Sequence, residues 1–85
     1  MQDEFRQAML AYIETLDRAI AVDEKLADDL AALADAIGSD PSQSSLRAAM
    51  LQDVHQHRAN AVRWREQVAA LKDEFADRRT ARTAG

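Results

Sequence analysis

Residues 5–37 read FRQAMLAYIETLDRAIAVDEKLADDLAALADAI, and apolar side chains recur through this stretch in alternating steps of four and three. That spacing places them along one side of a helix, where they can pack against a second helix. The first stripe consists of Phe5, Met9, Tyr12, Leu16, Ala19, Asp23, Leu26, Leu30, Leu33 and Ile37. Residues 46–75 carry a second stripe with nearly the same spacing, which consists of Leu46, Met50, Val54, His57, Ala61, Trp64, Val68, Leu71 and Phe75.

The two stripes mirror each other across a short connecting segment. Positions pair so that their residue numbers add up to 83 or 84, as for Leu33 with Met50 and for Ala19 with Trp64. Antiparallel helices joined by a short turn have this relation. We therefore predict an all-α fold, an antiparallel helical hairpin of two long helices, in which the small Ala19 faces the large Trp64 across one layer.

The expected boundaries of the first helix and of the turn follow from single residues. The first helix is predicted over residues 3–37, and Gly38 ends it because glycine adopts the left-handed conformation at little cost. A tight turn follows over residues 38–40. The whole chain, residues 1–85, is predicted to form a single domain.

The second helix is predicted over residues 41–79. Asp40 is suited to its N-cap, Pro41 to its first helical position and Gln43 to the third position of a capping box. Residues 80–85 are predicted to form a frayed tail.

The composition excludes several classes of protein. Two glycines and one proline are too few for a turn-rich fold, and the lack of cysteine excludes a disulfide framework and fits a reducing compartment. Residues 1–4 lack the apolar core of a signal peptide. The longest uncharged apolar stretch, residues 7–13, is too short to span a membrane. We expect a cytoplasmic protein that makes no membrane contact.

The two halves of the chain carry opposite charge. Residues 1–43 contain three basic and ten acidic residues, whereas residues 44–85 contain eight basic and five acidic residues. Each exposed ion pair is expected to add only about 0.2–1 kcal/mol. The asymmetry therefore favours pairing of the first half with the second and disfavours pairing of like helices.

Asp23 and His57 are polar residues at positions of the two apolar stripes. They lie one layer apart, so a contact between them across the hairpin is geometrically reasonable. Three interpretations are open: a polar pair that fixes the register of the helices, two separately solvated side chains, or a functional metal or proton site.

The first helix has more apolar surface than one contact with a second helix uses. A third stripe recurs every seven residues beside the first, and it consists of Ile13, Ile20, Ala27 and Ala34. A lone two-helix hairpin buries little surface for its size. We therefore expect a homodimer, a four-helix bundle or coiled coil in which two copies bury this stripe between them. A different protein partner could cover it equally well.

No catalytic, cofactor or metal motif is present. His55 and His57 point to different sides of a helix, and Asp53 with His57 would supply only two ligands, with Asp23 a distant third. The Glu-x-x-His element of di-iron helical bundles is missing. We expect no enzyme activity, no cofactor and no bound metal.

A basic edge recurs every seven residues along the second helix and consists of Arg58, Arg65, Lys72 and Arg79. Such an edge could follow the phosphates of a nucleic acid. The alternative is that its cations meet acidic residues of the first helix or of a second subunit. The acidic pI, near 5.0, favours the alternative, so nucleic-acid binding is unlikely.

Two long helices joined by a tight turn resemble the architecture of the WXG100 secretion class. The turn here reads Ile37-Gly38-Ser39-Asp40-Pro41 in place of the Trp-x-Gly element, and Trp64 lies within the second helix. The resemblance implies a secreted helical hairpin. The usage of alanine, arginine and aspartate suggests a high-GC genome and would suit a phage or another mobile element.

The sequence therefore predicts a non-enzymatic module for protein–protein interaction or assembly. Its expected partners are a second copy of itself and a protein that the sequence does not identify. The first alternative is a small regulator that binds nucleic acid through the basic edge, and the second is a secreted hairpin of the WXG100 kind.

Overall fold

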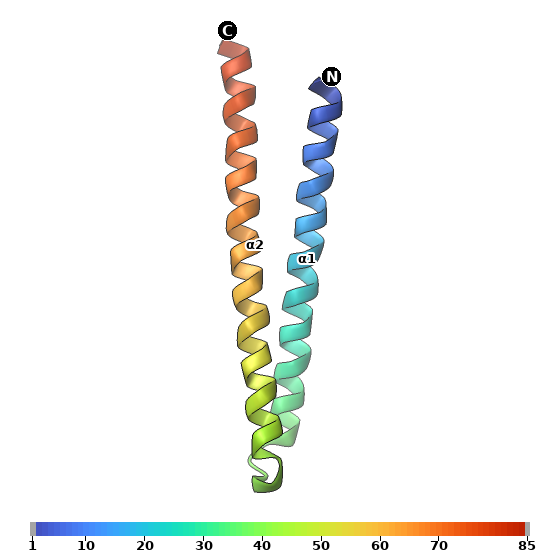
Figure 1. Cartoon of the computed structure of the whole chain (residues 1–85), viewed down its shortest axis with the longest axis vertical. Coiled ribbons are helices and arrows are strands. Elements are labelled where there is room, and N and C mark those ends of the chain that lie inside the picture. Colours follow the sequence, from blue (N-terminus) through green and yellow to red (C-terminus); the bar gives the residue numbers. More distant parts are fainter. Residues whose placement is uncertain (1, 85) are drawn as a thin grey trace.

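The chain folds into two long antiparallel helices that lie side by side and are joined by a short turn, so that the N- and C-terminal ends lie at the same end of the molecule (Figure 1). This computed structural model describes the backbone of residues 2–84 and the side chains of residues 3–76. Helix α1 spans Gln2–Ile37, and helix α2 spans Ser44–Ala84. The predicted all-α hairpin is confirmed, as a rod with extents of 67 × 18 × 13 Å.

Helix α1 ends as predicted at Gly38, which has a φ of +64°. The Gly38 N–H donates to the carbonyl oxygen of Ala34 at 3.1 Å, which satisfies one carbonyl of the last helical turn. Only glycine adopts this left-handed conformation without a steric penalty from Cβ. The residue therefore lets the chain leave α1 and reverse direction within a few residues.

Asp40 caps the segment that follows, as predicted. Its Oδ1 accepts hydrogen bonds from the backbone N–H of Ser42 at 3.0 Å and from the Ser42 hydroxyl at 2.9 Å. The first turn differs from the prediction, because Pro41–Gln43 forms a short 3₁₀ helix, η1, before α2 begins at Ser44. The observed contact of Gln43 with Asp40 runs from its backbone N–H to the Asp40 carbonyl at 3.0 Å, rather than from the side chain of a capping box.

Helix α2 extends beyond the predicted end at residue 79. Its backbone is helical to Ala84, so the prediction of a frayed tail over residues 80–85 is wrong as far as residue 84. The segment contains neither glycine nor proline until the final residue, and alanine and arginine are strong helix formers. Nothing local therefore stops the helix at residue 79.

The two helices meet along one seam. Its central cluster contains Ile13, Leu16 and Ile20 of α1 and Ala61 and Val68 of α2, all buried. Nearer the turn the buried residues are Ala27, Ala34 and Val54, and nearer the open end Met9 and Leu71 pack against the cluster. The buried positions of α2 belong to its predicted stripe, whereas those of α1 belong only partly to the predicted one.

Helix α1 is rotated about its axis relative to the prediction. The stripe assigned to a dimer interface lies inside the hairpin instead, with exposed fractions of 6% for Ile13, 6% for Ile20, 0% for Ala27 and 0% for Ala34. That assignment is wrong, because residues enclosed by α2 of the same chain cannot also line an interface with a second copy. The small side chains of Ala27 and Ala34 allow the helices to approach closely near the turn.

The same rotation exposes a stripe that was predicted to lie inside. Tyr12, Leu26 and Leu33 are exposed to 46%, 42% and 52%. The predicted enclosed layer of Ala19 and Trp64 is also wrong, since the Trp64 side chain is 37% exposed. Helix α1 carries three adjacent apolar stripes, but α2 can cover only two of them. It covers the stripe that contains Met9 and Leu16 and the stripe that contains Ile13 and Ile20.

The turn provides the first test. Gly38→Ala should lower the free energy of unfolding by about 1–2 kcal/mol, because the left-handed conformation disfavours a Cβ. The nearest atom to such a Cβ would be the Asp35 carbonyl oxygen at 3.8 Å, so no collision adds to that cost. Gly38→Asn, which tolerates this conformation better, should cost less in chemical denaturation. Equal stability of all three proteins would contradict the observed turn.

Two leucines of α1 test the rotation of that helix. Leu16 is 5% exposed and Leu10 is 48% exposed, so the same substitution probes both sides of the helix. Leu16→Ala should lower the free energy of unfolding by about 2–5 kcal/mol, and Leu10→Ala by less than about 0.5 kcal/mol. Chemical denaturation monitored by circular dichroism measures both. A larger loss for Leu10→Ala would place the seam on the other side of α1.

Candidate functional site

One long side of the hairpin carries ion pairs between the helices, and we call it the charged edge. The Arg65 guanidinium contacts Glu24 Oε1, and Arg58 Nη2 lies 3.8 Å from Asp28 Oδ1. Both arginines belong to the predicted basic edge, so two of its cations face acidic residues of α1, as the alternative to nucleic-acid binding expected. The side chain of Arg79, the fourth member, lies outside the described residues.

A shallow hollow lies along the charged edge where Asp17 and Glu24 of α1 face Arg65 and Lys72 of α2. Buried Ile20 and Val68 of the seam form part of its lining. The charges around the hollow are of both signs and come from opposite helices. The arrangement therefore holds the two helices in one rotational setting and offers no concentrated field of one sign to a ligand.

Asp23 and His57 form a direct polar contact across the seam. His57 Nδ1 lies 2.9 Å from Asp23 Oδ1, and the side chains are 28% and 16% exposed, respectively. The predicted contact is present, and the interpretation of two separately solvated side chains is wrong. The pair joins residues 34 positions apart, so it fixes the longitudinal register of the helices where the seam is otherwise apolar.

The polar pair does not extend into a metal site within the described part of the chain. No group of three or more histidine, cysteine, aspartate or glutamate side chains there is arranged to hold a metal ion. The arrangement instead suits a structural role, because each partner satisfies a polar atom of the other in a half-buried position.

The opposite long side of the hairpin carries a row of exposed apolar side chains, mostly from α1, and we call this row the apolar edge. It consists of Phe5, Tyr12, Leu26 and Leu33 of α1 and Trp64 of α2, all exposed. Residues seven apart lie on the same side of a helix, which aligns the four residues of α1. Leu26 lies about one turn from Asp23 on α1, and Trp64 lies about two turns from His57 on α2. Because Asp23 and His57 contact each other, Leu26 and Trp64 lie on the same long side of the hairpin.

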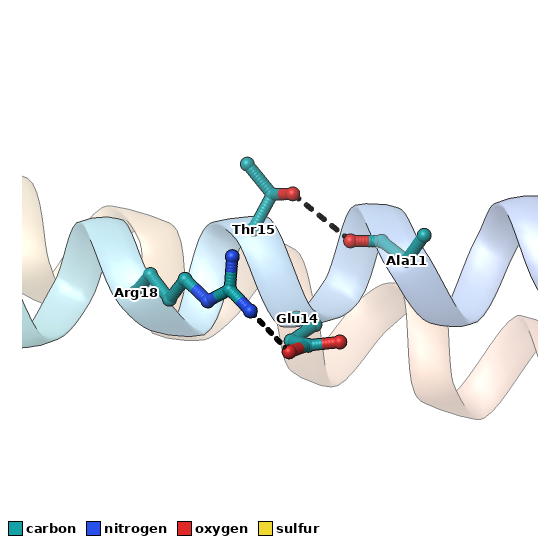
Figure 2. A network of polar contacts seen from close by, with 4 residues as sticks. All are labelled: Ala11, Glu14, Thr15 and Arg18. Carbon is teal, nitrogen blue, oxygen red and sulfur yellow. Dashed lines mark hydrogen bonds and ion pairs between the residues drawn. The ribbon is translucent and has the colours of Figure 1, made fainter.

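The face of α1 that points away from α2 is polar, and contacts within the helix order it. Arg18 Nη2 lies 2.5 Å from Glu14 Oε1, and the Thr15 hydroxyl donates to the carbonyl oxygen of Ala11 at 3.0 Å. Figure 2 shows both contacts. Lys25 Nζ similarly lies 3.1 Å from Asp29 Oδ2. These exposed pairs, one turn apart, each contribute about 0.2–0.5 kcal/mol to the helix. The charged pairs mark a solvated face between the two edges, and Thr15 lies where this face borders the apolar edge.

No protein-family model matches this chain, and neither a curated protein nor a solved structure is significantly similar to it. Over the described residues, neither helix combines the length and the apolar character needed to cross a lipid bilayer. The candidate site is therefore defined by the side chains themselves, and among the described residues the apolar edge stands out as a row of exposed large apolar side chains.

The polar pair can be tested with a double-mutant cycle. Asp23→Leu or His57→Leu alone should lower the free energy of unfolding by about 1–3 kcal/mol, because each leaves a half-buried polar partner without its hydrogen bond. The double substitution to leucine should be as stable as the original protein or more stable, since it replaces the pair by apolar side chains. Strictly additive effects would show that the contact contributes no coupling energy.

Proposed function

We propose that this hairpin is a non-enzymatic module for protein–protein interaction that self-associates and serves as an assembly component or adaptor. The observation that supports the proposal is the number of large apolar side chains left at the surface. Among residues 3–76, ten of them are exposed to between 37% and 58%, and five of these form the apolar edge. Large apolar side chains exposed in a row along one helix are typical of interaction sites.

The thin interior of the hairpin also supports association. Among the described residues no large side chain is fully buried, and the residues with no exposed area, Ala27 and Ala34, are alanines. Small domains with such limited cores commonly gain stability from a partner subunit. A homodimeric four-helix bundle would bury apolar side chains that a single hairpin leaves in water.

The outer charged surfaces would remain available to a further protein partner after self-association. The proposal includes the cytoplasmic location and the phage or mobile-element origin expected from the composition, for which the support is the absence of cysteine and the usage of alanine, arginine and aspartate. Nucleic-acid binding receives less support, because Arg58 and Arg65 already face acidic residues.

The mass in solution tests the proposal. Light scattering at micromolar concentration should give about twice the 9.5 kDa mass of one chain, with a helical circular-dichroism spectrum. Raising the salt concentration should leave this mass unchanged, because the association is apolar.

A fully helical protein with the mass of one chain across the micromolar range would contradict self-association. Tight binding to labelled duplex DNA that weakens steeply with salt would favour the nucleic-acid alternative in its place. The two experiments need only the unmodified protein, so neither depends on how a variant folds.

A further inference from the structure

One apolar stripe of α1, whose four large residues are exposed and whose central Ala19 is partly buried, has a symmetric order of side-chain sizes. It reads Phe5, Tyr12, Ala19, Leu26, Leu33, each seven residues after the last, so two large residues lie on either side of a small one. If two such stripes run antiparallel with their centres aligned, Phe5 meets Leu33 of the other copy and Tyr12 meets Leu26. Ala19 then meets itself. A surface that is complementary to itself in this way suits a two-fold dimer, in which each contact occurs twice.

We propose that the apolar edge binds the same edge of a second copy, with the two α1 helices antiparallel across a two-fold axis at Ala19. This inference rests on the proposed self-association and specifies its surface and symmetry. The small side chain at the axis allows the helices to come close where their contact begins. The larger side chains to either side then interdigitate along the length of the edge.

The apolar area fits an interface near the lower size limit of specific dimers. Phe5, Tyr12 and Trp64 are exposed to 47%, 46% and 37%, and Leu26 and Leu33 to 42% and 52%. Taking aromatic side chains at about 150–250 Å² each and leucines at about 60–120 Å² each, the exposed parts of the apolar edge amount to roughly 250–440 Å² per copy. Apolar atoms make up a little more than half of a typical interface, so two copies would bury on the order of 1,000 Å² in total, the size at which specific interfaces begin.

The residues beside the stripe are compatible with burial. Ala8, Thr15 and Val22 also recur every seven residues, three residues after Phe5, Tyr12 and Ala19, and the stripe ends at the exposed Asp29, which pairs with Lys25. The Thr15 hydroxyl already donates to the carbonyl oxygen of Ala11 at 3.0 Å (Figure 2), so covering it would leave no unpaired donor. Together the two stripes form a second heptad pattern on α1.

Charged residues border this second pattern. Arg18 pairs with Glu14, and Lys25 pairs with Asp29, so these side chains satisfy each other within α1 and need no partner from a second copy. On the α2 side, Asn60, Arg63 and Gln67 lie with Trp64 around a shallow hollow. An apolar centre with a polar rim is the usual anatomy of an interface.

Single introduced cysteines test the symmetry, because the natural chain has none. Ala19→Cys should form a disulfide between two copies quickly in oxidised glutathione, since the proposed axis brings the two Cα atoms within about 7 Å. Ala8→Cys is the matched control on the same helix. In the antiparallel arrangement its two copies lie about 33 Å apart along the axis, so it should remain reduced under the same conditions.

A pair of leucines tests the surface independently of any cross-link. Leu26→Glu should raise the dimer dissociation constant at least about tenfold, because each dimer would bury two unpaired carboxylates. Leu10→Glu places the same charge at an equally exposed leucine outside the apolar edge and should leave the dissociation constant unchanged. Sedimentation equilibrium gives both constants, and circular dichroism confirms that both variants are helical.

The outcomes separate the inference from the proposed function. Two results would overturn the apolar-edge dimer and leave self-association in place. One is equally fast cross-linking by Ala19→Cys and Ala8→Cys. The other is a dimer that Leu10→Glu dissociates and Leu26→Glu does not. A monomer under all conditions would overturn both.

Discussion

The rest of the structure depends on the seam where Ile13, Leu16 and Ile20 pack against Ala61 and Val68. A two-helix hairpin has one such contact, and each helix can turn only a limited arc of its surface toward it. The apolar residues of α1 cover a wider arc than this. Because the seam cannot bury all of these stripes, one of them stays in water. The seam buries the stripe of Ile13 and Ile20, and the stripe of Tyr12 and Leu26 is therefore exposed as part of the apolar edge.

The architecture could be predicted from the sequence because it depends on features that the order of residues encodes directly. The mirrored spacing of apolar residues gave the antiparallel pairing, and Gly38 and Asp40 marked the turn through their conformational and capping preferences. The contact between Asp23 and His57 was predictable for the same reason, since each is a polar residue in an apolar stripe one layer from the other. The rotation of α1 about its axis was not predicted, because the stripes led by Phe5, Met9 and Ile13 share one heptad repeat and fit the same register.

The charge pattern carried the information that would have fixed this rotation. Asp17 and Glu24 are seven residues apart on α1, and they match the seven-residue spacing of Arg65 and Lys72 on α2. Facing these residues toward each other turns Ile13 and Ile20 into the seam and turns Tyr12 and Leu26 out of it. Each pair contributes little energy, but the contacts of Arg65 with Glu24 and of Arg58 with Asp28 both lie on one side, and they favour this arrangement over others with similar apolar packing. The contact between Asp23 and His57 restricts movement along the helix axes, whereas the charged residues restrict rotation about them.

Some apolar residues of α1 pack within one chain and others between chains, and nuclear magnetic resonance of a mixed sample tests this division most directly. A sample of equal parts isotope-labelled and unlabelled protein reports contacts between copies in a filtered spectrum. We expect contacts between copies from the Tyr12 ring to the Leu26 methyl groups, whereas the Ile13 and Ile20 methyl groups should contact Val68 and Ala61 of their own chain. Contacts between copies from Ile13 and Ile20, with none from Tyr12, would contradict this division.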